Sequence, residues 1–125
     1  MPKNILRTEA APPPSALFSQ GTAGGGLIFT AQVGLLPTGT MVAGGVDAQA
    51  RQSLKNVKAV VASAGGKLTD VLQVTIYLLN LADVSTVNHV YAEFFPSEPP
   101  SRACIGVAAL PPGVLIEVQA VALRT

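Results

Sequence analysis

Two charged residues stand out in the C-terminal third of this 125-residue chain, because the sequence between them carries no charge. Arg102 precedes an uncharged run from 103 to 116, and Glu117 follows that run directly. Burying an unpaired guanidinium or carboxylate is costly, so a strand seldom contains either one without a partner. The pair is therefore the first candidate for chemistry.

Two interpretations of this pair stay open from the residues alone. The first is a structural salt bridge. If 102–107 and 114–123 form a hairpin, however, Glu117 lies opposite Gly106, four residues from Arg102 or roughly 13 Å along the strand. The second is a cleft, within one chain or between subunits, in which a small ligand bridges both charges. Arginine grips carboxylates through paired hydrogen bonds, and a glutamate can orient or deprotonate water.

The other chemically capable residues favour structural roles. Cys104 is the only cysteine, and a lone cysteine is usually a small buried hydrophobic residue when no histidine is placed to activate it. His89 is the only histidine and is interpreted as a surface or interface residue. The three glycines at 24–26 lack the lysine and helix start of a phosphate loop. No Cys/His set has zinc spacing.

Composition narrows the classes of partner. The chain is 49% hydrophobic and only 12% charged, where about a quarter charged is usual in soluble domains. So few charges favour an oligomer that hides apolar surface, although an Ala/Gly-rich monomer is the alternative. The net charge of +1, with scattered basic residues, argues against nucleic acid or an anionic membrane as a partner. Prolines and glycines interrupt the uncharged stretch 10–46, which argues against a membrane-spanning helix there.

Size and cysteine content suggest a cytoplasmic protein of one domain covering 1–125. This length suits a single hydrophobic core without disulfides or metals. One cysteine cannot form an internal disulfide, and the first 17 residues contain no apolar signal core. A reducing compartment is therefore expected.

Periodicity predicts an α+β layer that could position these residues. Apolar stripes at spacings of three and four predict helices opening at Asp47 and capped by Asp83. Alternation in 71–79 predicts a strand in which Leu72 and the alternate residues through Leu78 share one face. The other predicted strands are 27–33, 102–107, 114–123 and a further one near 17–20. Two helices would cover one sheet face, and subunit association would cover the other.

Several segments together resemble a known family. The C-terminal motif reads Pro-Ser-Arg-Ala-Cys-Ile at 100–105, then Val107, Leu-Pro at 110–111 and Ile-Glu-Val at 116–118. Further matching segments, in the family's order, are 18–21, 28–32, 50–57 and 87–95. From about 14 to 124, the chain is similar to the RidA/YjgF family of reactive-intermediate deaminases.

The resemblance implies a chorismate-mutase-like α+β fold and a homotrimer with ligand sites between subunits. It also implies hydrolysis of 2-iminobutanoate, 2-iminopropanoate and the enamine 2-aminoacrylate to keto acids and ammonia. Neither a metal nor an organic cofactor is expected. Carried over to this chain, the resemblance has Arg102 hold the substrate carboxylate and Glu117 position the attacking water. The other expected substrate-binding residues are Cys104 through its backbone, Thr30, Ala31 and, closing the pocket from a neighbouring subunit, Phe18.

Three of these positions depart from the pattern of many deaminating members, which have tyrosine, serine and glycine at Phe18, Thr30 and Ala31. A trimer that binds small carboxylates without turning them over is therefore an alternative function. An endoribonuclease, an activity attributed to some relatives, is a further alternative. The near-zero net charge and the lack of an aromatic and basic platform argue against RNA binding.

Overall fold

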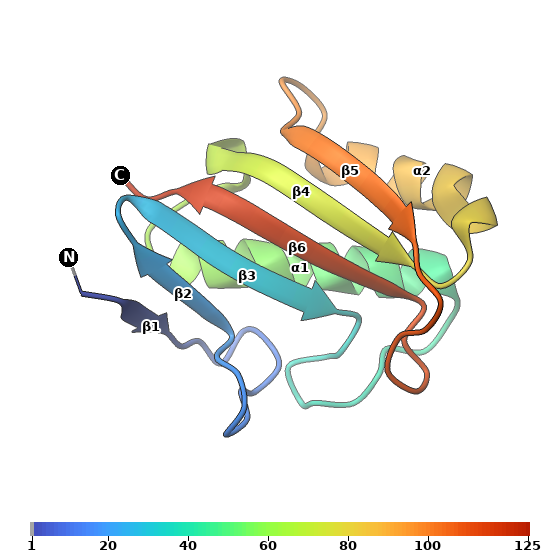
Figure 1. Ribbon diagram of the computed structural model, residues 1–125, viewed down its shortest axis with the longest axis horizontal. Coiled ribbons are helices and arrows are strands. Elements are labelled where there is room, and N and C mark those ends of the chain that lie inside the picture. Colours follow the sequence, from blue (N-terminus) through green and yellow to red (C-terminus); the bar gives the residue numbers. More distant parts are fainter. Residues whose placement is uncertain (1) are drawn as a thin grey trace.

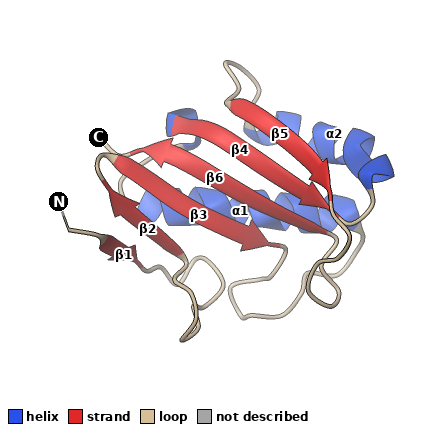
Figure 2. Cartoon of the chain, in the orientation of Figure 1, coloured by secondary structure: helices blue, strands red, loops and turns tan. Residues whose placement is uncertain are grey.

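Two helices cover one face of a six-stranded mixed sheet (Figure 1). The computed structural model describes residues 2–125. The strands are β1 (Asn4–Leu6), β2 (Gly21–Gly24), β3 (Leu27–Val33), β4 (Val71–Leu78), β5 (Ser101–Gly106) and β6 (Ile116–Leu123), and the helices are α1 (Val46–Ser63) and α2 (Val84–Phe94). Across the sheet, the strands follow the order β1-β2-β3-β6-β4-β5. The expected α+β class, with both helices on one face, is confirmed (Figure 2).

The helices form where the apolar stripes predict them. Leu54, Val57 and Val61 of α1 are almost fully buried against the sheet, and Gly65, at φ +85°, follows the end of the helix. Asp83 is the N-cap residue of α2, as predicted, but its side chain makes no capping hydrogen bond. A capping hydrogen bond is made at the preceding 3-10 turn, Leu81–Asp83, where the side chain of Asn80 accepts from the nitrogen of Ala82 at 3.0 Å.

The predicted C-terminal hairpin is wrong, because β4 lies between β5 and β6. β5 runs parallel to β4 on one side, and β6 runs antiparallel to it on the other. The proline-rich loop between them crosses the end of β4, and Val107 donates to the carbonyl of Leu78 at 2.9 Å. This crossing places β6 between two partners, so both of its edges are hydrogen-bonded.

A bulge changes the expected face of one residue in β4. The pairing with β6 shifts register between Val71 and Gln73, and Leu72 is therefore turned outward with 44% of its surface exposed. The alternation predicted from Val74 to Leu78 is otherwise confirmed.

The prediction of a strand near residues 17–20 is wrong. Strand β1 precedes that segment and β2 follows it, with β1 paired to β2 and β2 paired to β3. Residues 15–18 form a turn in which the nitrogen of Ser15 donates to the carbonyl of Phe18 at 3.1 Å. This turn leaves Leu17 and Phe18 exposed, at 93% and 63% of their surfaces.

The second sheet face has no helix over it. On β3, Ile28 is buried toward the helices, whereas Phe29 and Ala31 point outward, and Phe29 is 43% exposed. We call this side, which includes Phe29, Ala31 and Glu117, the open face. Within residues 2–125, neither helix combines the length and the apolar character needed to cross a membrane.

Candidate functional site

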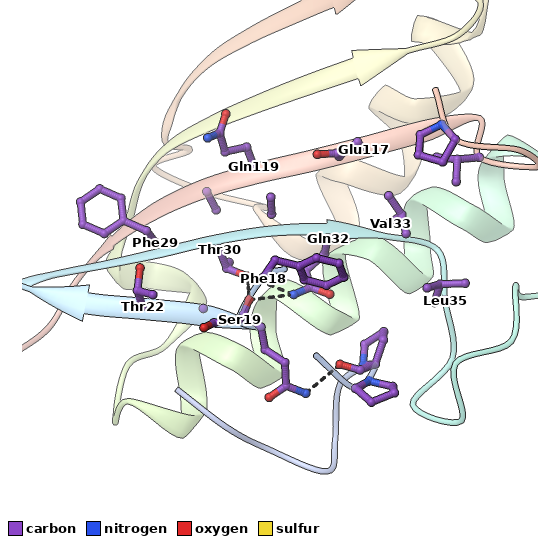
Figure 3. Close-up of a pocket in the computed structure, with 18 of the residues that line it drawn as sticks. Phe18, Ser19, Thr22, Phe29, Thr30, Gln32, Val33, Leu35, Glu117 and Gln119 are labelled. Carbon is purple, nitrogen blue, oxygen red and sulfur yellow. Dashed lines mark hydrogen bonds between the residues drawn. The ribbon is translucent and has the colours of Figure 1, made fainter. Parts of the chain in front are cut away.

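A pocket of about 820 Å³ lies on the open face, between the N-terminal arm (residues 7–20, which join β1 to β2), β3, β6 and the loop before β6 (Figure 3). Its volume is in the range of small-molecule sites. Its walls are mostly apolar, and they include Val33, Leu35 and Val114. Glu117 is the only charged residue among those that line it. A single carboxylate at an apolar wall is suited to the handling of a water molecule or a proton.

The strand pattern explains why Glu117 faces this pocket. Its neighbours Ile116 and Val118 are buried in the core on the helix side, so the alternation of β6 directs Glu117 to the open face. Its cross-strand partners are Val33 on β3 and Tyr77 on β4.

Four of the six predicted site residues are brought together here. Phe18, Thr30 and Ala31 line the same pocket as Glu117. The Thr30 hydroxyl donates to the carbonyl of Gln20 at 2.7 Å, so this side chain ties β3 to the N-terminal arm. The structure does not bring Arg102 or Cys104 into this pocket.

Arg102 lies on the opposite face of the sheet. It pairs with Val74, and Cys104 pairs with Ile76, so both residues are on the helix side, where Cys104 packs against the core. The Arg102 guanidinium carbon lies 4.7 Å from the centre of the Tyr91 ring on α2. Within residues 2–125 of one chain, Arg102 and Glu117 therefore do not form the salt bridge of the first interpretation.

The salt bridge found among residues 2–125 joins the two helices instead. Arg51 of α1 and Glu93 of α2 meet at 2.8 Å on the exposed helix face. The hydrogen bond from Arg51 lowers the pKa of Glu93, and the same bond raises the pKa of Arg51. Because both side chains are exposed, this pair is a surface contact rather than part of a site. Within the same residues, no three His, Cys, Asp or Glu side chains gather as metal ligands.

Tyr91 is buried beneath Arg102. It is 8% exposed, and its ring stacks on Phe95 with centroids 4.8 Å apart. Its hydroxyl is buried and has no hydrogen-bond partner within residues 2–125. Burial raises the pKa of Tyr91, and the positive charge of Arg102 partly opposes that rise.

Three buried amide side chains besides Gln32 hold the segments around the pocket, and none of the three was among the predicted site residues. Gln20 secures the N-terminal arm: its amide nitrogen donates to the carbonyls of Thr8 and Pro12, both at 2.8 Å, and its oxygen accepts from the Thr8 nitrogen at 2.8 Å. The side chain is only 3% exposed, so these bonds satisfy it in place of water.

The other two amides lie on α1. Gln49 donates to the Gly113 carbonyl at 3.0 Å and accepts from the Leu115 nitrogen at 2.8 Å, which fixes the loop before β6. Asn56 donates to the carbonyls of Val33 and Leu35 at 3.0 and 2.8 Å, which fixes the exit of β3. In the sequence, two amides seven positions apart on one face of the predicted helix could have indicated these contacts, because buried amides need specific hydrogen-bond partners.

Comparison with known proteins agrees with this architecture. The family model described as Endoribonuclease L-PSP matches residues 8–124. A 2-iminobutanoate/2-iminopropanoate deaminase of Salmonella typhimurium is 42% identical, over 95% of this chain and 96% of its own. The crystal structure of Escherichia coli TdcF with bound serine has a TM-score of 0.91 at 38% identity, covering 98% of this chain and 99% of TdcF. The E. coli YjgF gene product has a TM-score of 0.91 at 41% identity, covering 98% of this chain and 99% of its own.

Proposed function

Because this chain belongs to the endoribonuclease L-PSP family, which includes the RidA/YjgF proteins, we propose that it is a deaminase of 2-imino and 2-enamino acids. The observation that carries the proposal is the lone carboxylate of Glu117 in an apolar pocket of metabolite size. The Salmonella relative named for 2-iminobutanoate and 2-iminopropanoate supports the substrate class. The serine bound to TdcF, a small amino acid, supports it too. The cytoplasm is the proposed compartment.

The proposed assembly is a homotrimer in which Arg102 of one subunit meets the Glu117 pocket of its neighbour. Within one chain the sheet separates the two side chains, so a small ligand that touches both must lie between subunits. Exposed apolar residues on the open face and the arm support burial in such a contact. They include Phe29 at 43% exposure and Phe18 at 63%.

The proposed reaction needs only water as co-reactant. Arg102 holds the substrate carboxylate through charge-assisted hydrogen bonds and so fixes the imine carbon in place. Glu117 accepts a proton from water while the water oxygen bonds to the imine carbon and the π electrons of the C=N bond move to the nitrogen, which takes up a proton. Transfer of the proton held by Glu117 to this nitrogen then allows the remaining C–N bond to break. Ammonia leaves with the bonding electrons, and the new hydroxyl loses its proton to give the keto acid. An enamine substrate first tautomerises to the imine.

The remaining predicted site residues fit supporting roles in this proposal. Phe18, on its exposed turn, would close a pocket against substrate. Ala31 contributes its outward methyl group to the wall. The hydroxyl of Thr30 is committed to the arm, so its contribution is to the shape of the pocket. Cys104 directs its side chain toward the core, which leaves its backbone for ligand contact.

A coupled assay tests the activity. A serine lyase generates 2-aminoacrylate, and pyruvate release is followed with wild type, Arg102→Ala and Glu117→Gln. Matched controls are Arg124→Ala and Glu93→Gln, which remove charges that do not line the pocket. Acceleration by wild type and the controls, with loss in both site variants, is expected. Carboxylate binding without acceleration would instead indicate the binding-only trimer, and salt-sensitive RNA cleavage would indicate the endoribonuclease; either would refute the deaminase.

Mixed trimers test the subunit arrangement. Arg102→Ala and Glu117→Gln chains are unfolded together and refolded as a mixture. If the site combines Arg102 of one subunit with Glu117 of the next, each mixed trimer regains about one intact site in three. No mixture regains activity if both residues act within one chain, and that result would overturn the proposed arrangement.

A further inference from the structure

Arg102 is supported from one side only. It stands on β5, an edge strand whose single partner is β4, and its side chain is exposed. Its guanidinium lies over the Tyr91 ring, with 4.7 Å between its carbon and the ring centre. The salt bridge seen among residues 2–125 does not involve it. The ring is therefore the contact that distinguishes Arg102 from an ordinary surface arginine.

The Tyr91 ring is a fixed support. It is 8% exposed, held by α2 beneath it and by the Phe95 ring at 4.8 Å. Its hydroxyl makes no hydrogen bond within residues 2–125. The interactions of this side chain with Arg102 and Phe95 are therefore made by its aromatic ring. A buried, closely packed ring offers the guanidinium a defined plane on which to rest.

We propose that Tyr91 is a positioning residue, whose ring holds the Arg102 guanidinium in the orientation that receives a substrate carboxylate. The inference rests on the proposed function, because it takes Arg102 as the carboxylate-binding group.

The chemistry of the contact favours this role over a simple packing contact. A ring face attracts the cation without using its N–H donors, so the edge of the guanidinium stays free for two parallel bonds to a carboxylate. A glutamate or aspartate in place of the ring would occupy those donors and neutralise the charge. The opposing effect of Arg102 on the pKa of Tyr91 is consistent with electrostatic coupling between the two groups.

The test measures carboxylate binding, which does not require turnover. Pyruvate affinity is measured by calorimetry on the assembled wild-type protein, Tyr91→Leu, Tyr91→Phe and the control Phe94→Leu. Phe94→Leu removes a ring of the same helix that takes part in neither the Arg102–Tyr91 contact nor the Tyr91–Phe95 ring pair. Loss of the Tyr91 ring should weaken pyruvate binding about three- to fivefold, as expected for an exposed cation–π contact. Tyr91→Phe keeps the ring and should stay within about twofold of wild type.

Two further readouts separate positioning from general stability. With the imine substrate, Tyr91→Leu should raise KM and leave kcat unchanged. The reason is that Arg102 binds the substrate carboxylate equally strongly in the ground state and in the transition state. Binding of pyruvamide, the uncharged analogue, should not change, whereas a distorted pocket would weaken both ligands. If Tyr91→Leu does not fold, Tyr91→Met replaces it as a flexible filler without a ring.

The outcomes for the inference and for the proposed function are distinct. If pyruvate binding depends on Arg102 but is unchanged in Tyr91→Leu, the inference is overturned and the proposed role of Arg102 survives. Equal weakening of pyruvate and pyruvamide would also overturn it. If Arg102→Ala leaves pyruvate binding unchanged, the role of Arg102 in the proposed function fails, and the positioning role of Tyr91 fails with it.

Discussion

Replacing Gln49 by leucine perturbs the hydrogen bonds that hold the loop before β6 to helix α1. The side chain is 3% exposed and serves two backbone groups, the Gly113 carbonyl and the Leu115 nitrogen. That loop carries Pro111 and Pro112 to the pocket wall and leads directly into Glu117. Gln49→Leu therefore tests whether one buried amide determines the shape of the candidate site.

The expected cost follows from where the two backbone groups lie. Gly113 is exposed, so its carbonyl can find water, and its lost bond costs about 1 kcal/mol. Leu115 is half-buried, and its unpaired N–H costs about 1–3 kcal/mol. The free energy of unfolding should therefore fall by about 2–4 kcal/mol in Gln49→Leu.

Urea unfolding at equal protein concentration measures this change, because association would otherwise shift the apparent stability. The matched control is Ser53→Ala. Ser53 is fully buried on the same helix, and its hydroxyl donates to the Gln49 carbonyl at 2.7 Å. That carbonyl keeps its helix environment when the hydroxyl is lost, so the control should lose less than about 1 kcal/mol. Hydrogen exchange at the Leu115 amide adds a local measure, and its protection should fall in Gln49→Leu.

A midpoint for Gln49→Leu equal to that of Ser53→Ala, together with unchanged protection of the Leu115 amide, would refute this reasoning. It would mean that the loop is held by its own backbone contacts and that the Gln49 bonds are dispensable.

Three further predictions use other contacts. Gly34→Ala should destabilise the protein by about 1–3 kcal/mol, because its new Cβ would lie 2.8 Å from the Gln49 Cα; an unchanged melting temperature would contradict the close approach. Burial raises the pKa of Tyr91 in the folded protein. The stability that the neutral Tyr91 side chain contributes is therefore complete below the ordinary tyrosine pKa of about 10 and is lost as the pH rises above it. Tyr91→Phe should therefore lose less stability than wild type in alkaline unfolding titrations, and identical alkaline curves would exclude this effect. The hydrogen bond from Arg51 lowers the pKa of Glu93, so its contribution is present above the ordinary glutamate value and is lost as the pH falls below it. Glu93→Gln should slightly lower the unfolding midpoint at neutral pH and low salt but not in acid, and an equal loss at both pH values would contradict this assignment.

Local patterns in the sequence predict many of the helices and strands and the faces that they bury. The stripe through Leu54, Val57 and Val61 determines the buried face of α1, because a helix repeats every 3.6 residues whatever it packs against. Alternation likewise determines that Ile116 and Val118 face the core and that Glu117 faces away from it. The isolated charges at Arg102 and Glu117 singled out the candidate site residues by type, before any geometry was known.

Strand order was decided only by the tertiary structure, and the relation of Arg102 to Glu117 depends on it. Residues 107–115 are equally compatible with a hairpin and with a crossing over β4, since the preference depends on hydrogen bonds to a strand some 30 residues earlier. The bulge that turns Leu72 outward and the amide contacts of Gln49 depend on similarly distant partners. Periodicity is a property of neighbouring residues, and so it determines which way a side chain points from its own strand. Which strands lie side by side, and which faces two charges share, is determined by pairing across the whole chain.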